Sequence, residues 1–337
     1  MNKPFKRCIA FTDIHFGNKG NSAVFNQDCT DFINWMCDIA KDRDCDTCIF
    51  LGDWHHHRNT INVSTLNYTT KNLKKLNDSF KTTYFIPGNH DLFYREKRDI
   101  NSLPMLDDQY PNIQIIHNTT RVGDVVFMPW LVEDEWKSVK KTKCKYMFGH
   151  FEIPGFKLNA QIEMPDHGEV NRAHFKNIEY VFSGHFHRRQ VSENIHYIGN
   201  PFGHDYSTSW DFDHGCMILE WDKEPEYINW EDCPKYISVT VSQLLDNLDI
   251  LNDKFYVKCE QDVELSFEES TSLKEKIIND YKVREFKLTQ PKSTEHIDGS
   301  DEVVKFDTID QIIANEINNI ESETFDKAVL LSILNEI

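Results

Sequence analysis

Five short polar clusters in the N-terminal half of the chain contain side chains that commonly bind metal ions. The clusters are TDIH, GDWHHH, GNHD, GHFE and GHFH, and their candidate ligands are Asp13, His15, Asp53, Asn89, His150, His185 and His187. Carboxylate, imidazole and amide oxygen together suit borderline ions such as manganese, iron or zinc better than calcium. Seven ligands are more than one ion needs, so the set predicts a pair of divalent cations. Two adjacent cations can activate water and stabilise both oxygens of an in-line phosphoryl displacement.

The spacing within the clusters suggests how these side chains meet. Residues two apart in a strand point to the same side, so we expect Asp13 and His15 to face one site, and likewise His185 and His187. The three other ligands each follow an apolar stretch, mostly beside a glycine that lets the backbone turn sharply. A single histidine after a strand is more often a hydrogen-bonded structural residue. The prediction therefore depends on the ordered set of five clusters.

Alternating strands and helices must position the clusters. We expect strands at 7–11, 47–51, 83–86, 113–117, 125–128, 145–148, 180–183 and 196–198. Helices are expected at 25–40, where Phe32, Ile33, Met36 and Ile39 recur at helical spacing, and at 64–76. This pattern predicts an α/β layered fold, in which ligands bind in the loops beyond the strand ends. The site should lie along that edge.

The chain changes character after the first domain, which we expect at 1–220. Residues 221–289 predict a small α+β capping domain, with strands at 237–242, 255–258 and 284–288 and a helix at 267–281. The acidic stretch 290–307 is poor in large apolar side chains, which predicts a flexible linker. Residues 308–337 predict two amphipathic helices. Their apolar faces are Ile309, Ile312, Ile313, Ile317 and Ile320, and Val329, Leu330, Ile333, Leu334 and Ile337.

The net charge of −18 at first argues against a polyanionic substrate, because phosphate binding is largely electrostatic. The charge is unevenly distributed, however. Residues 1–215 carry 25 Lys+Arg against 27 Asp+Glu, a net of −2, and residues 216–337 carry 12 against 28, a net of −16. Metal ions would also neutralise several N-terminal carboxylates. The first part of the chain is therefore compatible with a nucleic-acid substrate.

The ordered motifs resemble those of a known superfamily. The succession D-x-H, GD, GNHD, GH and GHxH, over about the first 200 residues, resembles the calcineurin-like metallophosphoesterases. Within that superfamily the chain resembles the SbcD / Mre-eleven nucleases of DNA double-strand-break repair, particularly the recombination-nuclease subunits of tailed phages. The stretches GDWHHHRNTINVSTLN, MPWLVEDEW and IGNPF carry this narrower resemblance. It implies a layered α/β sandwich with a small capping domain and a C-terminal helical tail.

The resemblance also implies a role for each residue of the clusters. One metal would be held by Asp13, His15, Asp53 and His187, and the other by Asp53, Asn89, His150 and His185. His90 would protonate the leaving oxygen or stabilise the transition state, and Asp91 would orient its ring. His56 matches a further family histidine near the scissile phosphate, although the neighbouring His55 and His57 leave the register open.

Positive side chains beside the clusters are candidate contacts to a DNA backbone, because they would place a duplex against the metals. The candidates are Arg58, Arg95, Lys97, Arg98, Arg188 and Arg189. For any single one of them, solvated surface charge is the better explanation. Trp130 is expected to be a packing residue.

The resemblance implies a manganese-dependent DNA exonuclease and endonuclease, with magnesium, iron or zinc as alternative ions. Its expected partners are DNA, an SbcC-type coiled-coil ATPase bound through the tail helices, and a second nuclease subunit within a heterotetramer. The tail could instead pack on its own core. A stand-alone metallophosphatase or phosphodiesterase for a small-molecule or protein substrate shares the metal site, but has little use for the accessory domain. A non-catalytic scaffold of the same fold is disfavoured because every ligand position is filled.

Composition also bears on localisation. No segment approaches the roughly 18 apolar residues of a membrane span, and the first residues resemble a strand rather than a signal peptide. The nine cysteines form no regular framework, which suits a reducing compartment. We therefore expect a cytoplasmic protein without a membrane partner, in the host cytoplasm if a phage encodes it.

Overall fold

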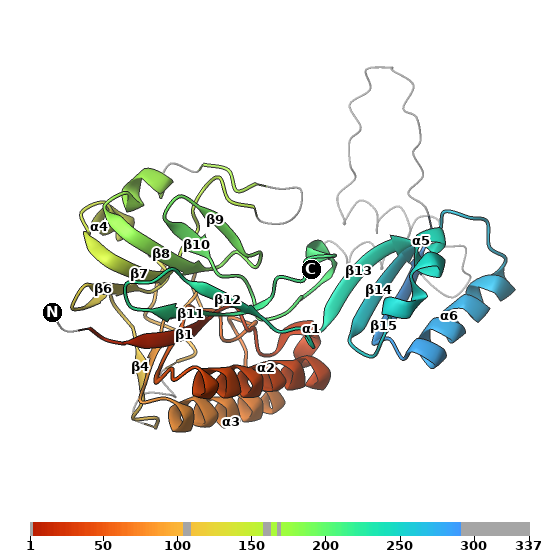
Figure 1. Ribbon diagram of the computed structural model, residues 1–337, viewed down its shortest axis with the longest axis horizontal. Coiled ribbons are helices and arrows are strands. Elements are labelled where there is room, and N and C mark those ends of the chain that lie inside the picture. The colour runs from red at the N-terminus through yellow and green to blue at the C-terminus, as the bar shows by residue number, and fades with distance from the viewer. Residues whose placement is uncertain (1–2, 104–108, 158–162, 167–169, 291–337) are drawn as a thin grey trace, which may run out of the picture. The chain divides into compact units, whose positions relative to one another are not determined.

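The computed structural model describes residues 3–103, 109–157, 163–166 and 170–290. Two six-stranded mixed sheets form most of the first 230 residues (Figure 1). The first sheet has the order β12-β11-β1-β2-β3-β4. Its strands are β1 (Arg7–Phe11), β2 (Thr47–Phe50), β3 (Thr82–Phe85), β4 (Ile113–Ile115), β11 (Gly215–Glu220) and β12 (Glu226–Asn229).

The second sheet has the order β5-β6-β7-β8-β10-β9. Its strands are β5 (Thr120–Val122), β6 (Val125–Met128), β7 (Cys144–His150), β8 (Ile178–Gly184), β9 (Gln190–Ser192) and β10 (Ile195–Tyr197). The two sheets pack face to face through one buried cluster, to which the first sheet contributes Ala10 and Ile49 and the second Phe127 and Phe148. The expected layered α/β sandwich is confirmed.

Two long helices cover the outer face of the first sheet. They are α2 (Ala23–Asp42) and α3 (Val63–Ser79). Successive strand residues point to opposite faces of a sheet. Phe11 and Phe50 point to the outer face, where they pack with Phe32 of α2 and Leu73 of α3. The Asn62 side chain caps α3 by accepting a hydrogen bond from the Ser64 backbone N–H. The shorter helices are α1 (Asn18–Asn21), α4 (Trp136–Val139) and 3₁₀ turns at Arg172–Phe175 and Tyr206–Thr208.

Parallel pairing brings the ends of distant strands to one edge. In the first sheet β1, β2 and β3 are parallel, with Phe11 opposite Phe50 and Phe50 opposite Phe85. In the second sheet β6, β7 and β8 are parallel, and His150 lies opposite Gly184. The carboxyl ends of parallel strands meet at the same edge, so the polar clusters that follow these strands are neighbours.

A three-stranded parallel sheet, β13-β14-β15, follows the sandwich. Its elements are β13 (Lys235–Thr240), α5 (Val241–Asp246), a 3₁₀ turn (Leu248–Ile250), β14 (Phe255–Glu260), α6 (Phe267–Tyr281) and β15 (Glu285–Thr289). This small domain has a hydrophobic core of its own, in which Val257 of β14 and Ile277 of α6 are fully buried. The Ser266 hydroxyl and the Glu269 carboxylate form a reciprocal capping box that begins α6.

Several elements differ from the sequence-based expectation. The strands β5, β9, β11 and β12 were not predicted, and the boundary expected at residue 220 is wrong. Because β11 and β12 pair as an antiparallel hairpin within the first sheet, that sheet continues to Asn229. The linker from residue 291 and the helices expected at 308–337 lie outside the described residues. Among the residues described, no helix is both long and apolar enough to cross a membrane.

Candidate metal centre

The candidate ligands lie in tight turns just beyond the strands. β1 ends at Phe11, and both Asp13 and His15 follow in the left-handed region, with φ of 51° and 53°. Asp and His adopt this conformation more readily than most residues. The turn stays paired with the turn after β2, since the N–H of Asp13 donates to the Gly52 carbonyl at 2.9 Å. The expected strand alternation of Asp13 and His15 is therefore wrong: the turn, and not the strand, places them together.

The first ligand group consists of Asp13, His15, Asp53 and His187. The Nε2 atoms of His15 and His187 lie 3.2 Å apart. Each also approaches Asp13 Oδ1, at 4.0 Å and 3.9 Å. His15 and both carboxylates are almost fully buried, whereas the His187 side chain is 34% exposed. Two imidazole nitrogens and two carboxylates thus surround one small volume that is open on the His187 side.

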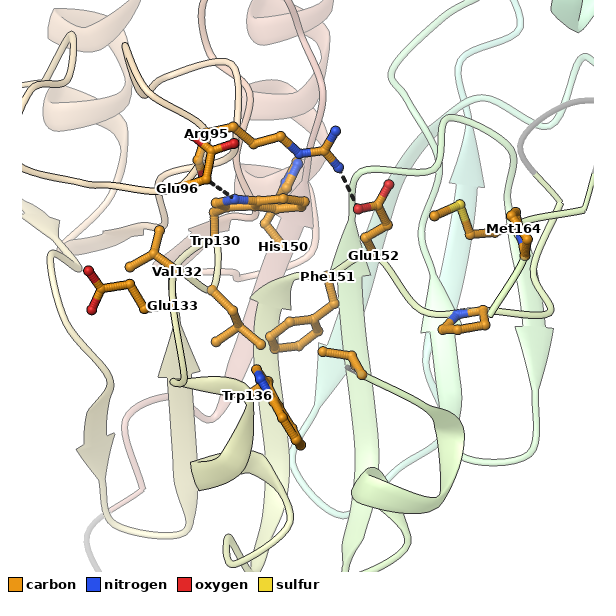
Figure 2. A pocket seen from close by; sticks show the side chains of 14 residues that line it. Arg95, Glu96, Trp130, Val132, Glu133, Trp136, His150, Phe151, Glu152 and Met164 are labelled. Carbon is orange, nitrogen blue, oxygen red and sulfur yellow. Dashed lines mark hydrogen bonds and ion pairs between the residues drawn. The ribbon is translucent and has the colours of Figure 1, made fainter. Parts of the chain in front are cut away.

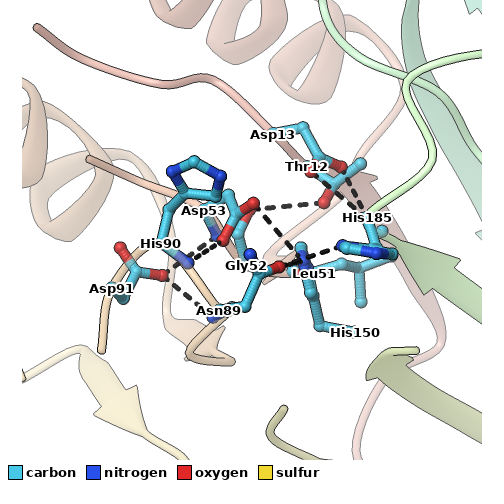
Figure 3. Close-up of polar contacts among 12 residues, drawn as sticks. Thr12, Asp13, Leu51, Gly52, Asp53, Asn89, His90, Asp91, His150 and His185 are labelled. Carbon is cyan, nitrogen blue, oxygen red and sulfur yellow. Dashed lines mark hydrogen bonds and ion pairs between the residues drawn. The ribbon is translucent and has the colours of Figure 1, made fainter. Parts of the chain in front are cut away.

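The second ligand group consists of Asp53, Asn89, His150 and His185 (Figure 3). The Oδ1 of Asn89 lies 3.1 Å from His150 Nε2 and 2.9 Å from His185 Nδ1. The other ring nitrogen of His150, Nδ1, faces the Leu51 carbonyl at 2.6 Å. A carbonyl oxygen only accepts hydrogen bonds, so it holds the His150 proton on Nδ1 and leaves Nε2 directed into the group.

Asp53 belongs to both groups. Its Oδ2 atom lies 3.7 Å from His15 Nε2 in the first group and 3.4 Å from His150 Nε2 in the second. Its Oδ1 atom accepts a hydrogen bond from the His90 backbone N–H at 2.8 Å. One carboxylate oxygen is therefore anchored to the backbone while the other faces both groups. This is the position that a bridging ligand requires.

The donor set fits divalent cations. In the second group, the Nε2 lone pair of His150 faces the oxygens of Asn89 and Asp53, so three acceptors converge and need a positive charge between them. Burial, together with the charge of Asp53, outweighs the lowering effect of His150 and raises the pKa of Asp13 to about 7. Although burial lowers the pKa of His150, the carboxylates of Asp53 and Asp13 raise it to about 9. Without a metal, protons supply the missing positive charge.

Glycines allow the clusters to approach one another. Gly52 has a φ of +107°, and a Cβ there would lie 2.4 Å from Nδ1 of His150. A Cβ at Gly88 would lie 2.2 Å from Asp53 Oδ1. Any side chain at these positions would displace a ligand. The glycines of the GD and GN pairs are therefore required because there is no space for a side chain at these two positions.

His90 lies at the edge of the centre, but its ring is oriented by a different partner from the one that the sequence suggested. Its ring is 4.8 Å from that of His15, and its Nδ1 atom faces the His56 carbonyl at 2.7 Å. Asp91 was expected to orient this ring, and that role is wrong. Both Asp91 oxygens accept hydrogen bonds from backbone amides, which belong to Asp53, Trp54, His55 and Gly88. Asp91 therefore holds the two ligand turns in place.

The structure resolves the register of the three consecutive histidines. The ring nitrogens of His55 contact the hydroxyls of Ser102 and Thr69, both at 3.0 Å, so this residue is structural. His56 is the one that faces the centre. Its ring stacks on that of His90 at 5.6 Å, and a ring nitrogen lies close to those of His15 and His90.

The candidate DNA contacts fall into two classes. Arg98 pairs with Glu135 and is only 13% exposed, and Arg189 bonds to the Ile198 carbonyl and Asn229 while stacking on Tyr227. Both side chains are thus bound within the protein, which makes them weaker candidates for DNA contacts than the sequence suggested. Arg95 and Arg188 are about 40% exposed but pair with Glu152 and Asp211. Arg58 and Lys97 form no side-chain ion pair or hydrogen bond with another described residue.

A pocket of about 440 Å³ adjoins the second group (Figure 2). Trp130 forms the wall between them, with its ring 5.1 Å from that of His185 and its indole N–H bonded to the Arg95 carbonyl. The opposite side is apolar and includes Trp136 and Phe151. Glu152 is at the rim, paired with Arg95 and 3.5 Å from His185 Nε2. Trp130 packs as expected, but it packs on metal-ligand candidates.

The sequence-based analysis missed two residues at this centre. Glu152 follows GHF in a cluster from which only His150 was chosen. His204 follows IGNPFG, and one of its ring nitrogens lies close to those of His15 and His187. A histidine in an irregular loop carries no spacing signal. Its position could be found only from the fold.

Comparison with known proteins identifies a family. The model of the calcineurin-like phosphoesterase family matches residues 6–189, more than half of the chain. Exonuclease subunit 1 of Enterobacteria phage T4 is 28% identical over 198 residues, which are 56% of this chain and 58% of that protein. The chain thus spans less than two thirds of this relative.

Two solved structures match part of the chain. The nuclease MPE of Pseudomonas putida is 16% identical, with a TM-score of 0.29 over 56% of this chain and 66% of that one. A dimetal phosphatase of Danio rerio is 10% identical, with a TM-score of 0.39 over 64% and 92%. Both scores are low. The family match and the ligand geometry together show that this chain belongs to the calcineurin-like phosphoesterase family, whose members use divalent metal ions.

Proposed function

We propose that this protein is a metal-dependent DNA exonuclease and endonuclease. The observation that carries the proposal is the convergence of seven ligand side chains into two groups that share Asp53. One cation would be held by Asp13, His15, Asp53 and His187, and the other by Asp53, Asn89, His150 and His185. The mixture of imidazole and oxygen ligands suits manganese, with magnesium, iron and zinc as alternatives. When bound, the pair would supply Lewis acidity to the attacking and leaving oxygens of a phosphodiester.

His90 is proposed to donate the proton that the leaving oxygen needs. The carbonyl of His56 holds one proton on Nδ1, so Nε2 is the atom that can carry a transferable proton. The backbone N–H of His90 is fixed by Asp53, which couples the position of the acid to that of the shared ligand. The stacked ring of His56 restricts rotation of the imidazole. A fixed acid at the rim of a two-cation site suits in-line displacement.

Several observations favour DNA over a small phosphate ester. The T4 relative is named as an exonuclease subunit. The His187 side of the first group is open, and the pocket beside Trp130 has both the aromatic surface and the volume to accommodate a base next to the scissile phosphate. Arg58 and Lys97 remain the candidates for backbone contacts, because neither has a side-chain partner among the described residues that would compete with a phosphate.

The proposal extends to the assembly. We propose that residues 308–337 bind an SbcC-type coiled-coil ATPase through their two apolar faces, and that two nuclease subunits join in a heterotetramer for DNA end processing, recombination and repair. Two observations support this proposal. The apolar residues of the tail recur at helical spacing, and the T4 relative is named as one subunit of an exonuclease. The proposed site of action is the cytoplasm, or the host cytoplasm for a phage protein.

The proposal can be tested with purified protein and manganese. We expect cleavage of duplex DNA at a much higher kcat/KM than hydrolysis of an aryl phosphodiester. The variant His90→Asn should retain metal and DNA binding but lose cleavage by about 10²–10⁴-fold, the usual contribution of a general acid. His57→Asn is the matched control, because His57 lies in the loop after β2, next to His56, and outside the ligand groups. Cleavage by His90→Asn at the wild-type rate would refute the role of His90, and a preference for the aryl ester would refute the DNA substrate.

A further inference from the structure

His204 is a buried histidine that the proposed ligand set does not include. Its exposed fraction is 2%, and neither ring nitrogen has a hydrogen-bond partner among the described residues. Burying an imidazole without a partner is unfavourable, because its polar atoms lose their hydrogen bonds to water. The fold therefore places His204 where another interaction must compensate.

The surroundings of His204 leave one direction for that interaction. On one side the ring packs on Phe25 of α2 and on Phe202, with ring centroids 5.4 Å and 5.3 Å away. On the other side it meets His15 and His187 edge to face, at 5.3 Å and 5.1 Å. Phenylalanine offers no ligand atom and no strong hydrogen bond. Of these four neighbours, only His15 and His187 offer ligand atoms, and both belong to the first ligand group.

The distances allow one cation to contact all three histidines. The ligand nitrogens of His15, His187 and His204 lie within 4.8 Å of one another. Nitrogens on opposite sides of a cation are about 4 Å apart, given metal–nitrogen bonds of about 2.0–2.1 Å. A side-chain movement of less than about 1 Å would close the difference.

We propose that His204 supplies a third imidazole to the cation of the first group. The inference rests on the proposed two-cation centre and refines its composition. The first position would then have three imidazoles and two carboxylates, whereas the second has two imidazoles, one carboxylate and one amide oxygen. Imidazole favours Zn²⁺, Co²⁺ and Fe²⁺ over Mg²⁺. The two positions are therefore unequal, and the first discriminates against Mg²⁺.

The test measures metal binding rather than activity. Metal-free full-length protein is titrated with Co²⁺, Zn²⁺ and Mg²⁺ by calorimetry, and the visible absorption of bound Co²⁺ reports its ligands. We expect His204→Phe to weaken one of two binding events for Zn²⁺ and Co²⁺ by at least about tenfold. The same event should change less for Mg²⁺, and the Co²⁺ spectrum should change in position or intensity.

His214→Phe is the matched control. His214 is 1% exposed and lies against the backbone of Asp211 and Asn200, and it belongs to none of the ligand groups. This variant should keep the wild-type affinities and spectrum. Circular dichroism verifies the fold of both variants, and if His204→Phe does not fold, His204→Leu replaces it in the same titrations.

The outcomes separate this inference from the proposed function. If the folded His204 variant binds Co²⁺ with the wild-type affinity and spectrum, His204 is not a ligand, while the two-cation centre still stands. An equal loss in His214→Phe would also overturn the inference, because it would point to general disruption of the loop. If the wild-type protein itself binds no divalent cation, the proposed function fails first.

Discussion

At the scale of single residues, Asp53 differs from the other ligands because one of its oxygens faces both groups. Asp53→Asn should therefore weaken binding of both cations, whereas His187→Asn should weaken only one. The reason is that the His187 ring approaches only the first group. Calorimetric titration with Mn²⁺ measures the two events separately. Equal effects of the two substitutions would contradict the assignment of Asp53 as the shared ligand.

The protons of the centre predict a pH dependence of metal binding. Asp13, with a pKa of about 7, and His150, with a pKa of about 9, both bear protons that a cation must displace. Metal affinity should therefore rise as the pH increases from about 6 to 9, and binding at pH 7 should release protons. Titration in buffers of different ionisation enthalpy counts these protons. Binding that is independent of pH in this range would contradict the proposed ligands.

Residue types limited what could be inferred about the positive side chains. Arg98 and Arg58 look alike in the sequence, since each follows a metal-binding cluster. Arg98 forms an ion pair with Glu135, a residue 37 positions away, whereas Arg58 has no such partner among the residues described. An ion pair between distant residues depends on the fold. The sequence could therefore name the candidates but could not separate them.

At the scale of elements, α2 is linked to the small parallel sheet by a buried ion pair. Arg284, just before β15, donates to Asp28 of α2 at 2.5 Å, and the Asp28 side chain is only 4% exposed. Arg284→Met should lower the free energy of unfolding by about 3–5 kcal/mol, because it leaves Asp28 buried without a partner. Urea denaturation measures this loss.

A second substitution separates loss of the ion pair from loss of packing. In the double variant Asp28→Asn with Arg284→Met, the buried charge is gone, so part of the stability should return. A double variant less stable than Arg284→Met alone would show that Asp28 contributes through other contacts.

The elements themselves were predicted to different degrees. The helix at 267–281 was predicted with its observed bounds, because its capping box and helical composition are local signals. The β11–β12 hairpin was missed, although GCMILE is apolar, because nothing local shows that it pairs with β1. Strand pairing depends on residues far away in the chain, and so does the boundary that was wrongly set at 220.

At the scale of the whole molecule, the proposed division of labour separates catalysis from assembly. Removal of residues 292–337 should leave metal binding and hydrolysis of an aryl phosphodiester within about twofold of the full chain, because every candidate ligand precedes that segment. Binding of the coiled-coil ATPase should be lost. Pull-down with the ATPase, beside the hydrolysis assay, measures both effects. A shortened protein that still binds the ATPase would exclude the tail as the main contact.

The sequence by itself determined the types of the candidate ligands, their order and the α/β layering, because these depend on short motifs and local periodicity. Only the tertiary structure decided that Asp91 bonds to the backbone of the ligand turns and does not orient the His90 ring. It also decided that His56 faces the centre and that His204 adjoins it. Each of these depends on which loops meet at the edge of two sheets. That edge is assembled from segments up to about 190 residues apart, and no local pattern records the distances between them.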